Sequence, residues 1–193
     1  MSKQNKKERI VSFPRMGNTA IAIKSVFEHM HAKVLMPPIN NKQTLNLGTR
    51  HSIETICMPY KLNLGNYIQA LESGANVLVM FQAPGTCRLG NYASMAEAKL
   101  RELGYDFEMV VFDMYKGKAK ELITKFSYAC GNHNVIDAIN AIRIGLEKFH
   151  VLDEIEKKLF YTRPRELEKG RSERVYEFGK QLIDRAKTFQ EIK

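Results

Sequence analysis

The chain has 193 residues, of which 44% are hydrophobic and 26% charged, a composition typical of one globular domain. Its longest apolar runs, such as residues 77–81, are far shorter than the ~20 residues of a membrane-spanning helix. The polar, basic start lacks the apolar segment of a secretory signal. Three cysteines in such a chain favour a reducing compartment over a disulfide framework. We therefore expect a cytoplasmic protein with no membrane association.

The net charge of +9 favours anionic ligands in general, but its distribution does not indicate a nucleic-acid interface. Only Lys3, Lys6, Lys7 and Arg9 form a cluster. Elsewhere basic and acidic residues are interleaved, which is typical of a solvated surface. We expect no nucleic-acid partner.

Short apolar segments alternate with helical patterns along the first two thirds of the chain. In chain order the sequence predicts a strand at 10–13, a helix capped by Asn18 or Thr19, a strand at 33–36, a short helix or turn at 44–48, a helix at 63–73, a strand at 76–81, a helix at 91–103 and a strand at 107–112. The continuous apolar run at 76–81 is typical of a strand buried on both faces. This alternation predicts an α/β fold: a doubly wound, mainly parallel sheet with helices on both faces.

Beyond residue 117 the strand pattern stops. Residues 135–160 and 175–189 each carry an apolar stripe at helical spacing. We therefore divide the chain into an α/β domain at 9–130 and a helical extension at 131–193. These stripes fit helices that pack against one another or against the sheet, or helices that bind a domain or subunit outside this chain.

Two cysteines follow elements that should end at the carboxyl edge of the sheet, where open parallel sheets bind ligands. Cys57 and Cys87 each precede a Leu-Gly-Asn-Tyr tetrapeptide, at 64–67 and 89–92, which we expect to open a helix. A thiol just before a helix start has a lowered pKa because it lies at the positive end of the helix dipole. The competing interpretation is that these cysteines pack as small hydrophobic residues.

Zinc has little support, because the chain has no Cys-x-x-Cys pair and its histidines lack ligand spacing. Thiolates on two loops of one sheet edge suit an iron–sulfur cluster better. The glycine-rich motifs of dinucleotide and ATP sites are absent. We expect Cys57 and Cys87 to be free thiols that lie close together, near Pro14 and Arg15, with Cys130 outside the site.

The same loops contain three longer motifs: Phe-Pro-Arg-Met-Gly-Asn at 13–18, Glu-Thr-Ile-Cys-Met-Pro-Tyr-Lys at 54–61 and Gly-Thr-Cys-Arg-Leu-Gly-Asn-Tyr at 85–92. With the stretch Tyr-Thr-Arg-Pro-Arg-Glu at 161–166, they resemble the 2-hydroxyacyl-CoA dehydratase superfamily. The resemblance is to the branch of CoA-substrate-specific enzyme activase-related proteins (CoA protein activase).

The resemblance implies a Rossmann-like domain whose loop cysteines hold an iron–sulfur cluster of the 4Fe–4S type. Cys57 and Cys87 would be the metal ligands, and Arg15, Lys61 and Arg88 would offset the charge of the cluster. Relatives carry further ligands in a second α/β domain, so a cluster in this chain would be incomplete, shared with another polypeptide, or absent.

The resemblance also implies a function and partners. The function is that of an electron-transfer component in an anaerobic or reducing cytoplasm, with dehydratase-like chemistry on acyl-CoA only when partner subunits are present. The implied partners are a second dehydratase-like polypeptide or domain and an ATP-dependent activator. The alternative is a non-catalytic scaffold, an orphaned domain of a larger dehydratase-like assembly that binds through the apolar stripes of residues 135–189.

Overall fold

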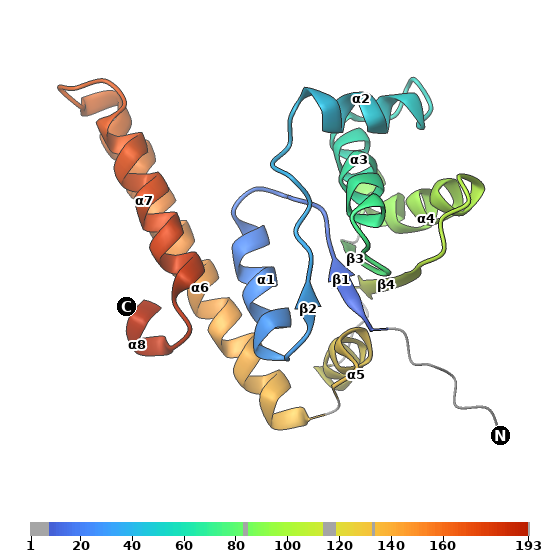
Figure 1. Cartoon of the computed structure of the whole chain (residues 1–193). Helices are drawn as coiled ribbons and strands as arrows, with labels where there is room; N and C mark the ends of the chain where they lie inside the picture. Colours follow the sequence, from blue (N-terminus) through green and yellow to red (C-terminus); the bar gives the residue numbers. More distant parts are fainter. Residues whose placement is uncertain (1–7, 83–84, 114–118, 133, 193) are drawn as a thin grey trace.

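The computed structural model describes residues 8–82, 85–113, 119–132 and 134–192. The fold is mixed α/β, with a four-stranded, wholly parallel sheet among the described elements (Figure 1). The strands are β1 (Ile10–Ser12), β2 (Lys33–Val34), β3 (Val77–Gln82) and β4 (Glu108–Asp113). The helices are α1 (Thr19–His29), α2 (Lys42–Arg50), α3 (Met58–Glu72), η1 (Arg88–Asn91), α4 (Tyr92–Glu102), α5 (Ala119–Cys130), α6 (Val135–Thr162), η2 (Arg163–Arg165), α7 (Arg171–Arg185) and α8 (Phe189–Ile192).

The strand order β2-β1-β3-β4 makes β1 and β3 neighbours although they are far apart in the sequence. β3 and β4 pair over six residues, from Val77 opposite Glu108 to Gln82 opposite Asp113. The chain leaves β1 towards β2 on one side and leaves β3 towards β4 on the other. The connections that follow β1 and β3 therefore diverge from the same point of the carboxyl edge, where open parallel sheets bind ligands.

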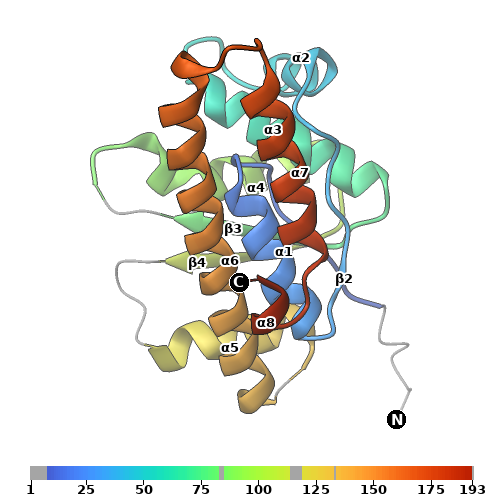
Figure 2. The same cartoon turned by 90° about the vertical axis from the view of Figure 1, so that its left-hand side faces the viewer.

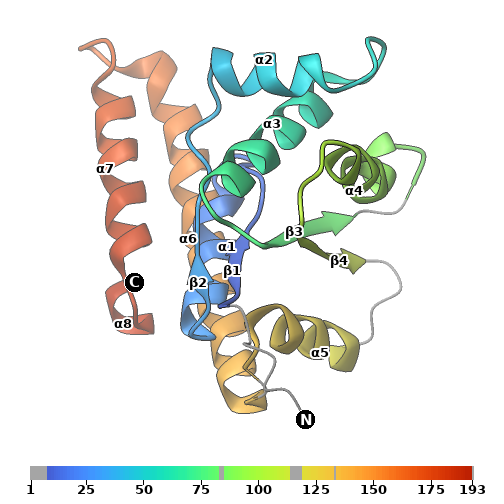
Figure 3. The same ribbon diagram turned by 45° about the vertical axis from the view of Figure 1, so that its right-hand side comes forward.

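β3 is buried on both sides, because successive side chains of a strand point to opposite faces. Val77 and Val79 pack in a cluster with α1, α5 and α6, whereas Leu78 and Met80 pack in a second cluster with α3 and α4. Figure 3 shows α3 and α4 on one side of the sheet and α5 on the other. The apolar run that predicted this strand therefore contributes to both cores, and burying each such side chain stabilises the fold by about 1.5–3 kcal/mol.

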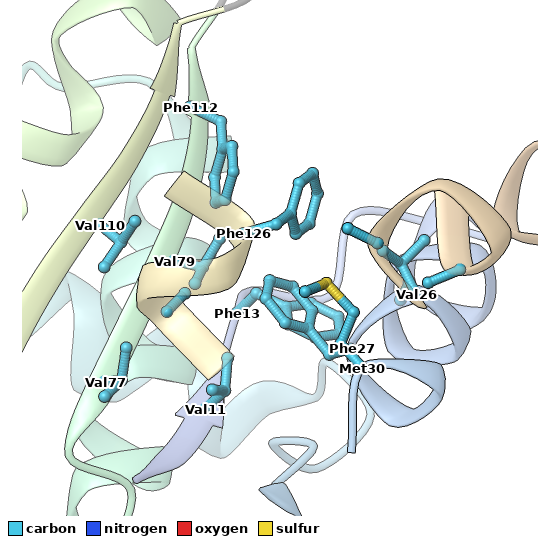
Figure 4. Close-up of a cluster of buried hydrophobic side chains, with 14 residues drawn as sticks. Val11, Phe13, Val26, Phe27, Met30, Val77, Val79, Val110, Phe112 and Phe126 are labelled. Atoms are coloured by element: carbon cyan, nitrogen blue, oxygen red, sulfur yellow. The ribbon is translucent and has the colours of Figure 1, made fainter. Parts of the chain in front are cut away.

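Aromatic rings join the sheet to the helices of the first cluster (Figure 4). The ring of Phe126 in α5 lies 4.4 Å from that of Phe112 in β4 and 5.3 Å from that of Phe27 in α1, measured between centroids. Ala138 and Ala141 of α6 belong to the same cluster. The first turns of α6 therefore pack on the core of the sheet.

α6 and α7 form a long hairpin that lies beside α1 (Figure 2). Lys148 of α6 is buried in this contact, and its ammonium donates to the backbone carbonyl of Asp184, at 3.1 Å. The carboxylate of Asp184 pairs with Lys24 of α1, at 2.9 Å. Burial lowers the pKa of Lys148, while the charge of Asp184 acts in the opposite direction. Although α6 is 28 residues long, it is not apolar enough to cross a membrane, nor is any other described helix.

The four predicted strands are all present, but several helices differ from the prediction. α3 begins at Met58 instead of residue 63, since Pro59 fits the first turn of a helix, where its missing N–H needs no partner. The first Leu-Gly-Asn-Tyr tetrapeptide therefore lies inside a helix and does not open one. Asn18 precedes α1 without capping it, because its side chain donates to Glu156.

The C-terminal part of the chain also differs from the prediction in two places. α5 was missed, and the helix predicted at 175–189 is α7, which begins and ends four residues earlier.

Glycines allow α2 and α3 to cross at close range. A Cβ on Gly48 would overlap the backbone carbonyl of Lys61, and one on Gly65 would overlap that of Thr44. A backbone carbonyl within a helix cannot move aside as a flexible side chain can. The two glycines are therefore required by the contact.

We predict that Gly65→Ala lowers the free energy of unfolding by about 1–3 kcal/mol, because the new methyl group is forced into this contact. Gly179→Ala in α7 is the matched control, since its Cβ would lie 3.5 Å from Ile155, an ordinary contact. Alanine favours a helix over glycine by about 1 kcal/mol, so this variant should be as stable as the wild type or more stable. Urea unfolding followed by circular dichroism compares the two; equal stabilities would contradict the close contact.

Candidate thiol site at the carboxyl edge of the sheet

The direction of α3 brings Cys57 to the carboxyl edge of the sheet. α3 leads into β3, so the helix begins near the edge at which the parallel strands end. Cys57 is the residue before its first turn and has an extended backbone. Cys87 follows β3 and directly precedes η1. Both cysteines therefore lie at the edge indicated by their positions in the sequence.

A hydrogen bond joins the start of α3 to the start of α4. The Sγ of Cys57 lies 2.6 Å from the Oη of Tyr92, the first residue of α4. Tyr92 is only 4% exposed, and its ring meets that of Tyr60 edge-on, with centroids 5.2 Å apart. The phenol is thus held in one orientation beside the half-buried thiol.

The surroundings of Cys57 favour its thiolate form. The hydrogen bond from Tyr92 is the largest influence that lowers the pKa of Cys57, and the backbone N–H of Tyr60 and the charge of Arg88 act in the same direction against the effect of burial. Burial, the bond to Cys57 and the nearby thiols raise the pKa of Tyr92 to about 12. At neutral pH the phenol therefore keeps its proton and donates a hydrogen bond to the sulfur.

Cys87 belongs to the same site. It is exposed, and its charge is one of the smaller influences that raise the pKa of Tyr92. Arg88 donates from Nη1 to the carbonyl of Thr55, at 3.4 Å, which holds the start of η1 against the segment before Cys57. All three cysteines of the chain are free thiols.

The other predicted basic residues lie in different places. Lys61 is in the first turn of α3 and donates from Nζ to the carbonyl of Glu54, beside the Cys57 segment, at 3.1 Å. Arg15 donates from Nε to the carbonyl of Pro37, at 2.5 Å, so its guanidinium is held at the connection between β2 and α2. Arg88, in contrast, lowers the pKa of Cys57 through its charge.

The backbone of Arg15 is held by two amides. Its N–H donates to Asn66 in α3, at 2.9 Å, and its carbonyl accepts from Asn40, at 3.0 Å. The loop after β1 is thereby tied to α3, the helix that presents Cys57. Arg15 thus contributes to the site through its backbone.

Cys130 lies outside the site, as expected. It ends α5 and packs against the first cluster, with α1, α5 and α6. Burial raises the pKa of its thiol to about 12. Its surroundings suit the neutral thiol, in contrast to those of Cys57.

Tyr92 is the residue of this site that the sequence analysis did not single out. Its position at the end of the second Leu-Gly-Asn-Tyr tetrapeptide was the available signal. The tyrosine of the first copy, Tyr67, instead donates to the carbonyl of Val79 in β3, at 2.9 Å. The two copies therefore serve different purposes, and only the second one reaches a cysteine.

The described residues do not contain a complete ligand set for an iron–sulfur cluster. Such clusters are commonly held by four cysteine thiolates. Cys57 and Cys87 amount to two such donors. Across residues 8–82, 85–113, 119–132 and 134–192 there is no group of three or more His, Cys, Asp or Glu side chains that could hold a metal ion. A complete ligand set therefore requires donors beyond these two thiols.

We predict that Tyr92→Phe raises the pKa of the Cys57 thiol, because the thiolate loses its main hydrogen-bond donor. The rate at which iodoacetamide alkylates Cys57 between pH 6 and 9, measured by peptide mass spectrometry, should fall several-fold at the lower pH values. Tyr60→Phe keeps the bond between Tyr92 and Cys57 and serves as the control. Cys130 should react slowest of all in the folded wild type. An unchanged pH profile in Tyr92→Phe would show that the phenol does not stabilise the thiolate.

Comparisons with known proteins add no assignment to this site. No protein-family model, no curated protein and no solved structure matched the chain. The chemistry of the two thiols, the phenol and the neighbouring arginine is therefore the basis on which a function can be argued.

Proposed function

We propose that this protein is an iron–sulfur-binding electron-transfer component. The observation that carries the proposal is that hydrogen bonds join the two cysteine segments: Cys57 bonds to Tyr92 at the start of α4, and Arg88, next to Cys87, donates to Thr55, two residues before Cys57. Thiolates are the form in which cysteines bind metal, and the lowered pKa of Cys57 favours that form.

The proposed fold is a doubly wound, Rossmann-like domain. The thiol site would lie at the point where the connections after β1 and β3 diverge. The division into this domain and a helical extension after residue 130 stays a prediction. The motifs around Cys57 and Cys87 resemble those of the 2-hydroxyacyl-CoA dehydratase superfamily, which is a second line of support.

Each residue has a role in this proposal. Cys57 and Cys87 would hold the cluster, which would supply one-electron transfer at low potential. Arg88 would offset negative charge near the sulfurs, and Tyr92 would donate a hydrogen bond to the sulfur of Cys57. Hydrogen bonds to sulfur and local charge are known to tune the potential of such clusters.

Because Cys57 and Cys87 are the only cysteines that the described residues place at this edge of the sheet, we propose that a second dehydratase-like polypeptide or domain completes the ligand set. An ATP-dependent activator would deliver the electrons, and acyl-CoA would be the substrate of the assembly. The proposed location is the cytoplasm.

Anaerobic reconstitution with iron and sulfide tests this proposal. The wild type should become brown, with thiolate-to-iron charge-transfer absorbance and bound iron and sulfide, and should assemble into a species larger than one chain. Cys57→Ala and Cys87→Ala should each reduce the bound iron to near background, whereas Cys130→Ala should retain it. A wild type that, with the product of the neighbouring gene present, binds no more iron than the chain carrying both Cys57→Ala and Cys87→Ala would contradict the proposal.

The alternative, a non-catalytic scaffold, is favoured by one observation on α7. Val175, Phe178 and Leu182 lie on one face of this helix and are all more than half exposed, with Phe178 at 60%. The buried residues of α7 are Tyr176 and Ile183, on a different side of the helix. Much of the stripe is therefore available to a partner.

If this stripe mediates assembly, the wild type should sediment as an oligomer or complex, and Phe178→Asp should convert it to a monomer. Gln181→Asp adds the same charge to an exposed polar position of α7 and should leave the assembly intact. Analytical ultracentrifugation distinguishes the two. A wild type that is already monomeric would count against the scaffold function.

A further inference from the structure

A groove runs along α6 on the face of the sheet opposite to the one against which Cys57 packs. It consists of two adjoining hollows of about 390 and 470 Å³, which share Thr19 and Phe149. On α6 the groove extends from Ile142 to Glu156, about 21 Å at the rise of an α-helix. We call it the α6 groove. It goes beyond the proposed function, because it uses none of the thiol chemistry.

The first hollow of the α6 groove is almost wholly apolar. It lies between α1, α5 and α6, beside the end of β3, and is lined by Phe81, Leu122, Phe126, Ile142, Leu146 and Phe149. Leu146 is 55% exposed and Phe149 is 45% exposed. Two large apolar side chains on one wall are thus available to an apolar partner.

The second hollow is acidic, in a chain whose net charge is +9. Asp153, Glu156, Glu173 and Glu177 line it, together with the single cation Lys180. Asp153, Glu173 and Glu177 each pair with a basic side chain of the hairpin.

Glu156 differs from the other three carboxylates. It accepts from the neutral groups of Asn18, at 3.1 Å, and Tyr176, at 3.4 Å. In the part of the chain that the structure describes, no lysine or arginine pairs with it. A cation at the acidic end would therefore neutralise Glu156 without displacing an existing ion pair.

We propose that the α6 groove binds an amphipathic helix of a partner protein, with apolar side chains in the first hollow and a lysine or arginine beside Glu156. Such helices lay an apolar face with anchors at spacings of three and four residues into a groove. A length of about 21 Å corresponds to about 14 helical residues. The groove is apolar at one end and acidic at the other. The partner helix should therefore bind in one orientation, with its basic end at the acidic hollow.

The α6 groove borders a loop that also contacts α3, the helix that presents Cys57. Gly17, Asn18 and Thr19, which line the acidic hollow, follow the same loop whose Arg15 backbone is held by α3. A helix in the groove would therefore lie against the connection after β1, across the sheet from Cys57.

The test uses fluorescence anisotropy with a labelled synthetic helix of 14 residues that has leucines on one face and lysines at one end. The wild type should bind it, and a peptide with glutamates in place of the lysines should bind at least about tenfold more weakly. Phe149→Asp should also weaken binding at least about tenfold, as expected for a central anchor. Glu156→Gln should weaken it several-fold and remove the preference between the two peptides.

Matched variants control for general effects of the substitutions. Phe160→Asp and Glu154→Gln change the same residue types on α6 outside the groove and should bind as the wild type does. If Phe149→Asp fails to fold, Leu146→Ser provides the second test of the apolar wall. Cys57→Ala and Cys87→Ala should bind the peptide normally, so that failure of the groove and failure of the thiol proposal are distinguishable.

Several results would overturn the proposal. These are equal binding by the wild type and Phe149→Asp, equal binding of the lysine and glutamate peptides, or no binding of either. Self-association that is lost in Phe149→Asp but is not displaced by the peptide would assign the groove to a second copy of this chain. Binding to anionic phosphatidylserine vesicles without binding to the peptide would assign it to a membrane surface.

Discussion

The two-sided burial of β3 is the constraint on which the rest of the structure depends. Its side chains alternate between the cluster with α1, α5 and α6 and the cluster with α3 and α4. β3 also pairs with β1 on one side and β4 on the other. A strand in this position can accept neither a polar side chain nor a proline without disturbing both layers. The thiol site lies at the carboxyl edge of the sheet that β3 centres, and the α6 groove lies on the side of the first cluster.

Much of the fold could be predicted because local patterns report local structure. The apolar run at 76–81 predicted a fully buried strand, and the segment at 135–160 predicted the long helix α6. The start of α3 was missed because Pro59 was taken as part of a loop, although proline is common in the first turn of a helix. The strand order depends on the pairing of β1 with β3, a long-range contact that no local pattern contains.

The site was predicted in its outline but not in its details. The positions of Cys57 and Cys87 relative to the elements around them indicated a shared edge, since the direction of a parallel sheet determines where each connection lies. The side chain of Arg15 could not be placed in this way. It donates to the carbonyl of Pro37, and only the tertiary structure brings these two residues together. Tyr92 was overlooked because tyrosines of repeated motifs look alike in sequence, whereas their partners differ.

The glycine-mediated crossing of α2 and α3 has a consequence for ligand binding. Cys57 ends the short connection between these two helices, and their backbones are in such close contact that neither can shift without the other. The thiol is therefore pre-organised: little conformational entropy remains for it to lose when a ligand binds, and the free energy of the new bond is retained as affinity. Substitutions in α2 that loosen its contact with α3 would make the Cys57 segment more mobile. They would therefore weaken ligand binding, although they lie far from any sulfur.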